Sequence, residues 1–221
     1  MKRDIALFFL FFLLLTACGA STPQPTPQLV NVYVSSAAYP WVSGFYNCAS
    51  TSVAVNLSDP QSADITLRLG ESDHLTTPAY QIASEDILVI VHPQSGISSL
   101  TLDQVRSIFL GQTTNWMEVG GNDVPMQVWT FSTNEDLQVI FSKVVMNGQL
   151  ITSLARLSVS AQDMIKAVGT NSGSIGFLPR KLLTAEVKEV YKVATVPVLA
   201  VTKSEPQGVI RELLSCLQEN H

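Results

Sequence analysis

The stretch that most constrains the fold is the apolar run from Asp86 to Pro93, DILVIVHP. Its interior is continuously apolar rather than alternating, and it is rich in β-branched residues, which favour strands. Such a strand is buried on both faces, as in a parallel sheet that helices cover. A helix is expected soon after it, because Thr101 is a good N-cap and apolar residues repeat at helical spacing up to Gly111. The run therefore indicates an α/β chain.

Strand-like and helix-like segments alternate through most of the chain, which predicts mostly parallel sheets. Further strands are expected at 29–36, 52–57, 63–70, 124–131 and 174–179, and at 190–201, where Pro197 interrupts the pattern. Further helices are expected at 39–50, 135–148, 160–173 and 206–218.

The N-terminus has the pattern of an export signal. Lys2 and Arg3 precede an uncharged run, 5–17, that is short for a membrane-spanning helix. The run ends in Leu-Thr-Ala-Cys at Cys18, which resembles the lipobox of bacterial lipoproteins, where the Cys is acylated. We expect a lipoprotein signal peptide at 1–17 and a Pro-rich tether at 18–28. The alternative is an ordinary signal peptide or an anchor helix that happens to end in Cys.

Charge and cysteine content limit the partners. The formal net charge is −5, and removal of the signal, with two basic residues and one acidic residue, changes it to −6. A mildly acidic chain without basic runs argues against binding to nucleic acid or anionic lipid. The His residues are scattered without ligand spacing, so neither a metal nor a cofactor is expected. Cys48 and Cys216 remain; they either pair, as exported cysteines often do, or pack as free core residues.

Catalytic patterns are not found in the sequence. No Gly-x-Ser-x-Gly motif occurs, and the acidic residues are dispersed. The adjacent pair Glu135 and Asp136 would point in different directions on a helix. We therefore expect a protein that is not an enzyme.

Three segments together resemble the phosphate-type solute-binding proteins of ABC importers. LTLDQVRSIFLGQTTNWMEVGG matches the helix ending in Ile-Phe-x-Gly that leads into a Trp-containing loop. SAQDMIKAVGTNSGSIGFLP matches the helix that leads to an Asn-x-Gly-x-Ile-Gly-Phe strand, and YQIASEDILVIVHP matches a strand that crosses between lobes. They cover about 80–179 in the family's order.

The resemblance implies a two-lobed, periplasmic-binding-protein-like fold of the second type, with mostly parallel sheets joined by crossing strands. Lobe one would comprise 29–87 plus 186–221, and lobe two 88–185. The solute would lie between the lobes at helix N-termini. Cys48 and Cys216 would share lobe one, which makes their pairing geometrically feasible.

The implied ligand site departs from the family pattern. Phosphate-binding members have a strand, an Arg and a Ser-Gly-Thr loop at a helix start, whereas 130–136 reads TFSTNED, without the Arg or the Gly. Three interpretations stay open: a self-capped helix end without a ligand, a retained oxyanion site, or a site for a neutral or cationic solute. Arg68 or Arg180 would replace the missing cation. The candidate ligand residues are Ser35, Ser36, Arg68, Ser132, Thr133, Asn134 and Ser174.

The function that the resemblance implies is extracytoplasmic solute binding. The protein would be anchored to the cell membrane through Cys18 alone, would act as a monomer, and would deliver phosphate or a related oxyanion to an ABC permease. The alternative is a ligand-free or divergent domain of the same fold that acts as a sensor or as a protein-interaction module.

Overall fold

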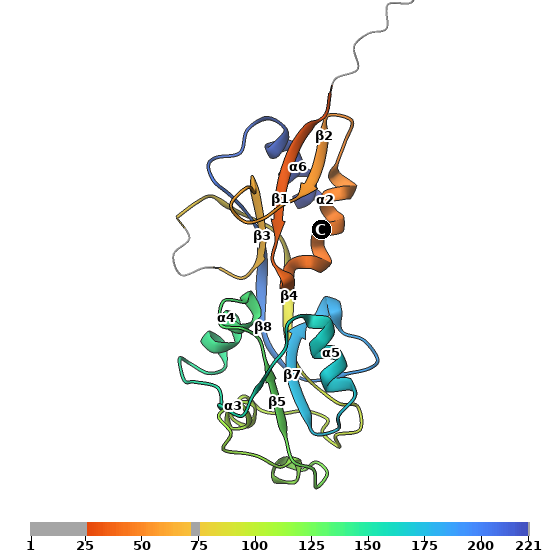
Figure 1. The fold of residues 1–221 in the computed structure, drawn as a ribbon, viewed down its shortest axis with the longest axis vertical. Helices are drawn as coiled ribbons and strands as arrows, with labels where there is room; N and C mark the ends of the chain where they lie inside the picture. Colours follow the sequence, from red (N-terminus) through yellow and green to blue (C-terminus); the bar gives the residue numbers. More distant parts are fainter. Residues whose placement is uncertain (1–25, 72–75, 221) are drawn as a thin grey trace, which may run out of the picture.

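The computed structural model describes residues 26–71 and 76–220. They form two lobes that lie one above the other along the long axis of the molecule (Figure 1). The strands of both lobes belong to one eight-stranded sheet, in the order β2-β1-β3-β8-β4-β7-β5-β6. The α/β class and the crossing strands predicted from the sequence are confirmed. Among the described residues, no helix is long and apolar enough to cross a membrane.

Lobe one holds the N-terminal strands and the last helix. Its elements are β1 (Gln28–Val34), η1 (Ser36–Trp41), α2 (Val42–Cys48), β2 (Val53–Leu57), β3 (Ile65–Leu69) and α6 (Gly208–Glu219). β1 pairs in parallel with both β2 and β3. A disulfide joins Cys48, at the end of α2, to Cys216 in α6. The chain therefore closes lobe one with a covalent link between two segments that are 168 residues apart.

Lobe two holds the middle of the chain. Its elements are α3 (Leu102–Phe109), η2 (Trp116–Val119), β5 (Gln127–Thr130), α4 (Asp136–Val144), β6 (Arg156–Leu157), α5 (Ala161–Gly169), β7 (Ser174–Pro179) and η3 (Arg180–Leu182). The helix ends match their sequence signals, because Thr101 and Ser160 cap α3 and α5. Gly111 has φ +75°, the left-handed conformation that a glycine adopts readily after a helix.

Two long antiparallel strands run through both lobes: β4 (Ala79–Val91) and β8 (Lys188–Thr202). Pro197 was expected to interrupt β8, but the strand continues through it, opposite Ser84 of β4. The missing N–H of Pro197 is tolerated beside an irregular stretch of the ladder, and its carbonyl accepts the Gly70 N–H at 2.8 Å. The apolar run 86–93 was expected to lie in a parallel strand, but β4 is antiparallel to both of its neighbours, β7 and β8. Parallel pairs flank this antiparallel centre on both sides.

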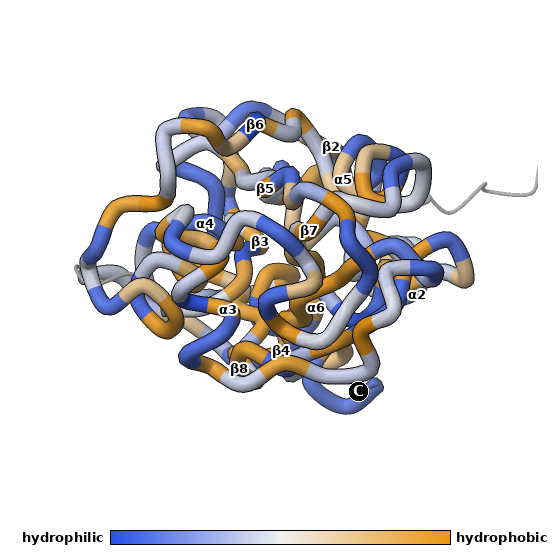
Figure 2. The backbone as a smooth tube through the Cα atoms, turned by 90° about the horizontal axis from the view of Figure 1, so that it is seen from below, coloured by the Kyte–Doolittle hydropathy of each residue, from blue (hydrophilic) through white to orange (hydrophobic). Residues whose placement is uncertain are grey.

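Each lobe has a packed apolar interior. Seen along the long axis, hydrophobic segments gather along β4, α3 and α6, and hydrophilic ones lie mostly in the connections (Figure 2). In lobe two the ring centroids of Phe141 and Phe177 lie 4.2 Å apart, with Phe109 4.5 Å from Phe141. These rings join α3, α4 and β7, so α4, which contributes to the candidate site, is packed firmly into lobe two.

Two glycines, one just before β7 and one within it, allow close packing. A Cβ at Gly173 would lie 2.3 Å from the carbonyl oxygen of Pro125, and one at Gly176 would lie 2.3 Å from the Met164 sulfur. The buried Trp116 indole donates to the Gly173 carbonyl at 3.1 Å. This segment therefore fastens the Trp-containing loop to β7 and lies within the interior of lobe two.

Candidate functional site

The candidate site lies where the two lobes meet, at the carboxyl ends of β1 and β3. These strands are parallel neighbours, so the residues that follow them emerge at the same edge of the sheet. Ser35 and Ser36 follow β1, and Arg68 is the next-to-last residue of β3. The Ser35 amide donates to the Leu67 carbonyl at 2.9 Å, which fixes this turn beside β3. Three of the predicted ligand residues are thus brought together.

The carboxylate of Asp136 occupies the centre of this cluster. Asp136 is the first residue of α4, on the side of lobe two that faces lobe one (Figure 1). Its Oδ2 accepts the Ser35 hydroxyl at 2.7 Å and the Leu69 amide at 2.9 Å. Its Oδ1 accepts Nη2 of Arg68 at 2.9 Å. One carboxylate from lobe two therefore receives a hydroxyl, an amide and a guanidinium from lobe one; we call this the Asp136 contact.

The helix end is not self-capped, contrary to one of the interpretations left open by the sequence. Glu135 is the N-cap residue of α4, and its side chain makes no capping hydrogen bond. Its carboxylate instead accepts the hydroxyl of Ser36, again across the lobes. Gln138, also in α4, interacts within lobe two: its Oε1 accepts the N–H of Phe131, the residue that follows β5, at 3.2 Å. The two acidic side chains are thus turned toward lobe one.

Burial makes the Asp136 contact strong. Asp136 is 7% exposed, and the side chain of Arg68 is 25% exposed. Hydrogen bonds to a charged group contribute about 1.5–3 kcal/mol each in proteins. The Nε of Arg68 is buried and has no hydrogen-bond partner among the described residues. The guanidinium therefore retains one unmet donor.

A second buried carboxylate lies on the crossing strand, also between the lobes. Glu85 of β4 is 5% exposed, and its carboxylate accepts the Trp41 indole N–H at 3.2 Å and the Lys181 amide at 3.2 Å. The ammonium of Lys181 lies 3.6 Å from the Trp41 ring centroid. Burial raises the pKa of Glu85, while the hydrogen bonds from Lys181 and Trp41 oppose the rise. We call this cluster the Glu85 contact.

The three predicted loop residues of lobe two do not join the donors of lobe one. Ser132, Thr133 and Asn134 are exposed, and among the described residues their side chains form no hydrogen bond to lobe one. Ser132 and Thr133 instead line a cavity of about 520 Å³ between β5, α4 and the segment 149–157. The structure thus places their hydroxyl groups beside a hollow of lobe two.

Two other predicted residues lie away from the cluster. Ser174 is fully buried at the start of β7, where its Oγ accepts the Trp129 indole N–H at 3.2 Å. Arg180, the alternative cation, donates twice to Glu189 at 2.9 Å and once to Asp86 at 3.1 Å. Arg68, and not Arg180, is therefore the cation that lies beside the start of α4. Cys18 lies outside the described residues.

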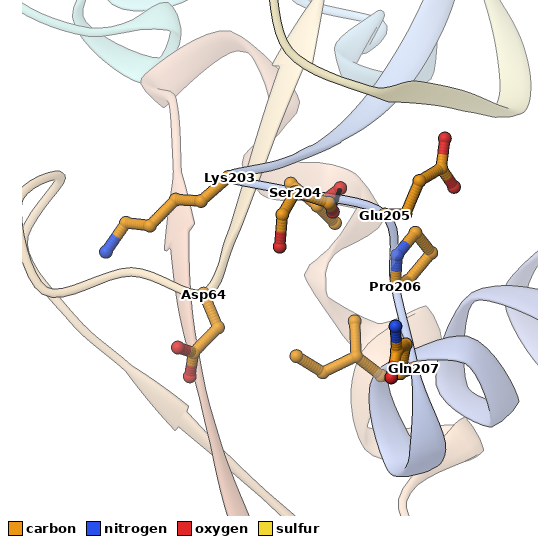
Figure 3. Close-up of a pocket in the computed structure, with 8 residues that line it drawn as sticks. Asp64, Lys203, Ser204, Glu205, Pro206 and Gln207 are labelled. Carbon is orange, nitrogen blue, oxygen red and sulfur yellow. Dashed lines mark hydrogen bonds between the residues drawn. The ribbon is translucent and has the colours of Figure 1, made fainter.

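Another hollow of about 350 Å³ lies at the opposite end of β3. In Figure 3 Lys203 and Glu205 extend to opposite sides of the turn that leads into α6. The Asp64 carboxylate accepts the Asn31 amide at 2.8 Å, and the Lys203 ammonium donates to a backbone carbonyl. The charged side chains that line this hollow, Asp64, Lys203 and Glu205, already have partners within the chain, so we do not regard it as a ligand site.

Sequence reasoning missed two parts of the junction. The Leu69 amide could not be found from residue type, because every residue but proline has a backbone N–H. Glu85 stood beside an apolar run, and nothing indicated that its side chain meets Trp41. Arg68 and the Glu135–Asp136 pair did carry a signal: a cation near one strand end, and two carboxylates where donors were expected.

Comparisons with known proteins agree on the fold. The family described as "PBP superfamily domain" matches residues 72–211. The phosphate-binding protein PstS of Bacillus subtilis is 26% identical over 155 residues, which are 63% of this chain and 51% of PstS. The chain therefore spans about half the length of this curated relative.

Solved structures show the same architecture at low identity. A phosphate ABC transporter substrate-binding protein from Clostridium perfringens, with bound phosphate, superposes with TM-score 0.77 at 19% identity, over 86% of this chain and 93% of that one. CbnR, a LysR family transcriptional regulator, superposes with TM-score 0.58 at 13% identity, over 86% of this chain and 69% of that one. Likenesses at this identity concern the fold alone, which more than one class of protein uses. On the family match, which covers more than half of its length, this chain belongs to the PBP superfamily, with the two-lobed fold that its sequence predicted.

Proposed function

We propose that this chain is an extracytoplasmic, lipid-anchored solute-binding protein of the phosphate-like class, and not an enzyme. It would bind phosphate or a related oxyanion between its lobes and deliver it to an ABC permease. The observation that supports this most is the Asp136 contact, in which Arg68, the Ser35 hydroxyl and the Leu69 amide converge on one anionic group.

The donor set fits an oxyanion by its chemistry. A guanidinium presents its N–H groups in a fixed fork that matches carboxylate and phosphate oxygens, and a hydroxyl and an amide supply further donors. Ser36 lies next to Ser35, at the start of η1 and at the same edge of the sheet. Ser132, Thr133 and Asn134, which directly precede the N-cap of α4, would approach a solute from lobe two. Ser174 is not part of this proposal, because its buried hydroxyl is engaged with Trp129.

The proposed cycle uses the crossing strands. The lobes, 29–87 plus 186–221 and 88–185, would move about β4 and β8, close over the solute and open on docking to the permease. Cys18 would be acylated after removal of 1–17, and the 18–28 tether would give the monomer reach from the membrane surface.

A second function has one observation in its favour. Asp136 already accepts hydrogen bonds from three of the donors, so the domain could close without any solute and serve as a sensor or protein-interaction module. This alternative predicts no oxyanion binding by the wild-type protein or by any variant in which Asp136 is replaced.

Calorimetric titration tests the proposed function. We expect phosphate to bind the purified protein, and Arg68→Gln to weaken binding by about tenfold or more, which is the effect of losing one strong charged contact. The control is Arg156→Gln, which makes the same charge change at an exposed residue of lobe two. Equal affinities in all three proteins would remove Arg68 from the site, and no binding of phosphate, sulfate or another oxyanion to any of them, or to Asp136→Ser, would refute oxyanion transport.

A further inference from the structure

We infer that Asp136 is a built-in competitor for the oxyanion site: its carboxylate takes the donors that a dissolved oxyanion needs, so solute must displace it. The inference rests on the proposed function, because it assigns a regulation to the same site. It makes Asp136 the residue that sets the affinity of the site for its solute and keeps the lobes together while the site is free of solute.

The donors to Asp136 come from distant parts of the chain. An acidic residue in the first turn of a helix can interact with the amides of its own helix. Asp136 instead accepts from Arg68, Leu69 and Ser35, which are 68, 67 and 101 residues away in the chain. All three donors belong to lobe one, and α4 belongs to lobe two. The contact therefore links the relative position of the lobes to the occupation of the donors.

The buried Nε of Arg68 is an independent sign that the donor set is only partly used. A buried donor without an acceptor is unfavourable, and it is rare in folded proteins. The carboxylate of Asp136 has two oxygens, and both already accept hydrogen bonds. A tetrahedral oxyanion has more oxygens and could supply the missing acceptor. With Asp136 in the site, at least one buried donor, the Nε of Arg68, is therefore left without an acceptor.

The competition has a quantitative consequence. A site that is free in only a fraction of the molecules binds its ligand with an apparent Kd that is larger by the inverse of that fraction. If Asp136 occupies the donors in about 90% of molecules, its removal lowers the apparent Kd by about tenfold.

The test is a titration of inorganic phosphate into the purified wild-type protein and Asp136→Ser. We expect phosphate to bind Asp136→Ser about tenfold more tightly than wild type. The matched control is Asp103→Ser, which makes the same charge change in the first turn of α3, where the side chain of Asp103 is 93% exposed. The control is expected to bind as wild type does. Asp136→Asn, which keeps the shape of the side chain, replaces the Ser variant if circular dichroism shows that the latter is unfolded.

The outcomes separate the inference from the proposed function. Equal phosphate affinity in wild type and Asp136→Ser would overturn the inference and leave the proposed function standing. A failure of every protein to bind phosphate or another oxyanion would overturn both. A similar gain in Asp103→Ser would assign the effect to overall charge and would also overturn the inference.

A second measurement uses the wild-type protein alone. Because the Leu69 amide donates to Asp136, its hydrogen exchange in phosphate-free buffer should be slow. Exchange of the Leu69 amide at the rate of a free exposed amide would show that Asp136 does not occupy the donors, and would overturn the inference without any variant.

Discussion

Asp136 and Glu85, the two buried carboxylates described at the junction of the lobes, accept hydrogen bonds from different kinds of donor. Asp136 is 7% exposed and Glu85 is 5% exposed, so burial alone does not distinguish them. Asp136 receives a guanidinium, a hydroxyl and an amide. Glu85 receives an indole N–H and backbone amides, while the Lys181 ammonium lies over the Trp41 ring. The donors around a buried carboxylate, more than its depth, decide what its charge does to stability.

The largest expected effect is the loss of the cation from the Asp136 contact. Arg68→Ala leaves the carboxylate of Asp136 buried without its counter-ion, and we expect a loss of about 3 kcal/mol in the free energy of unfolding. Urea unfolding of the purified variant measures it. Arg156→Ala, at an exposed site of lobe two, serves as the control. Equal losses in the two variants would contradict the strong pairing assigned to Arg68.

Within the same junction, the two serines should differ. Ser35→Ala removes a donor from the buried Asp136 and should cost about 1.5 kcal/mol of unfolding free energy. Ser36→Ala removes a partner of Glu135 in an exposed contact and should cost less than about 0.5 kcal/mol. The same unfolding assay compares them directly, and a reversed order would place the important carboxylate at Glu135.

Neutralisation of Glu85 should have the opposite sign. Because burial raises the pKa of Glu85, its charged form is disfavoured in the folded protein, and Glu85→Gln should gain up to about 1 kcal/mol at pH 7. The folded pKa lies above the unfolded value, so the contribution of Glu85 is fully present below about pH 4.5 and is lost as the pH rises through the folded pKa. Wild type and variant should therefore converge in stability at acidic pH. A gap that widens toward low pH would contradict this.

A small effect is also expected from the cation above Trp41. Lys181→Met removes a cation–π contact at an exposed residue and should cost about 0.5 kcal/mol of unfolding free energy. It should also raise the pKa of Glu85 further, because the positive charge of Lys181 lowers that pKa in the wild type. Nuclear magnetic resonance titration of the Glu85 side chain measures the change, with Lys166→Met as the control. An unchanged pKa would show that Lys181 does not act on Glu85.

Local signals in the sequence predicted the elements well. The N-caps Thr101 and Ser160 and the turn at Gly111 each act within a few residues, so the sequence shows them directly. The interruption expected at Pro197 did not occur, because the effect of a proline on a strand depends on which neighbour it faces in the sheet. Here the irregular ladder beside Ser84 tolerates it. The two-residue strand β6 carried no periodic pattern and was not predicted.

The candidate site was predictable only in pieces. Ser35, Arg68 and the Glu135–Asp136 pair each stood out near a strand or helix end. Their meeting depends on how the lobes face each other, which no local pattern encodes. Ser174 has the hydroxyl that a ligand residue needs, but its place at the other end of β5 and β7 turns it toward Trp129. Glu85 became informative only when Trp41 and Lys181 were placed beside it.

The disulfide between Cys48 and Cys216 makes most of the described chain a covalent ring. Lobe two and both crossing strands lie inside that ring, since their residues fall between the two cysteines. A protease that cuts one exposed loop of lobe two therefore leaves a single molecule, whose halves separate on a denaturing gel only after reduction. Because the disulfide keeps the two fragments in one molecule, such a nicked protein can also refold without having to find its other fragment.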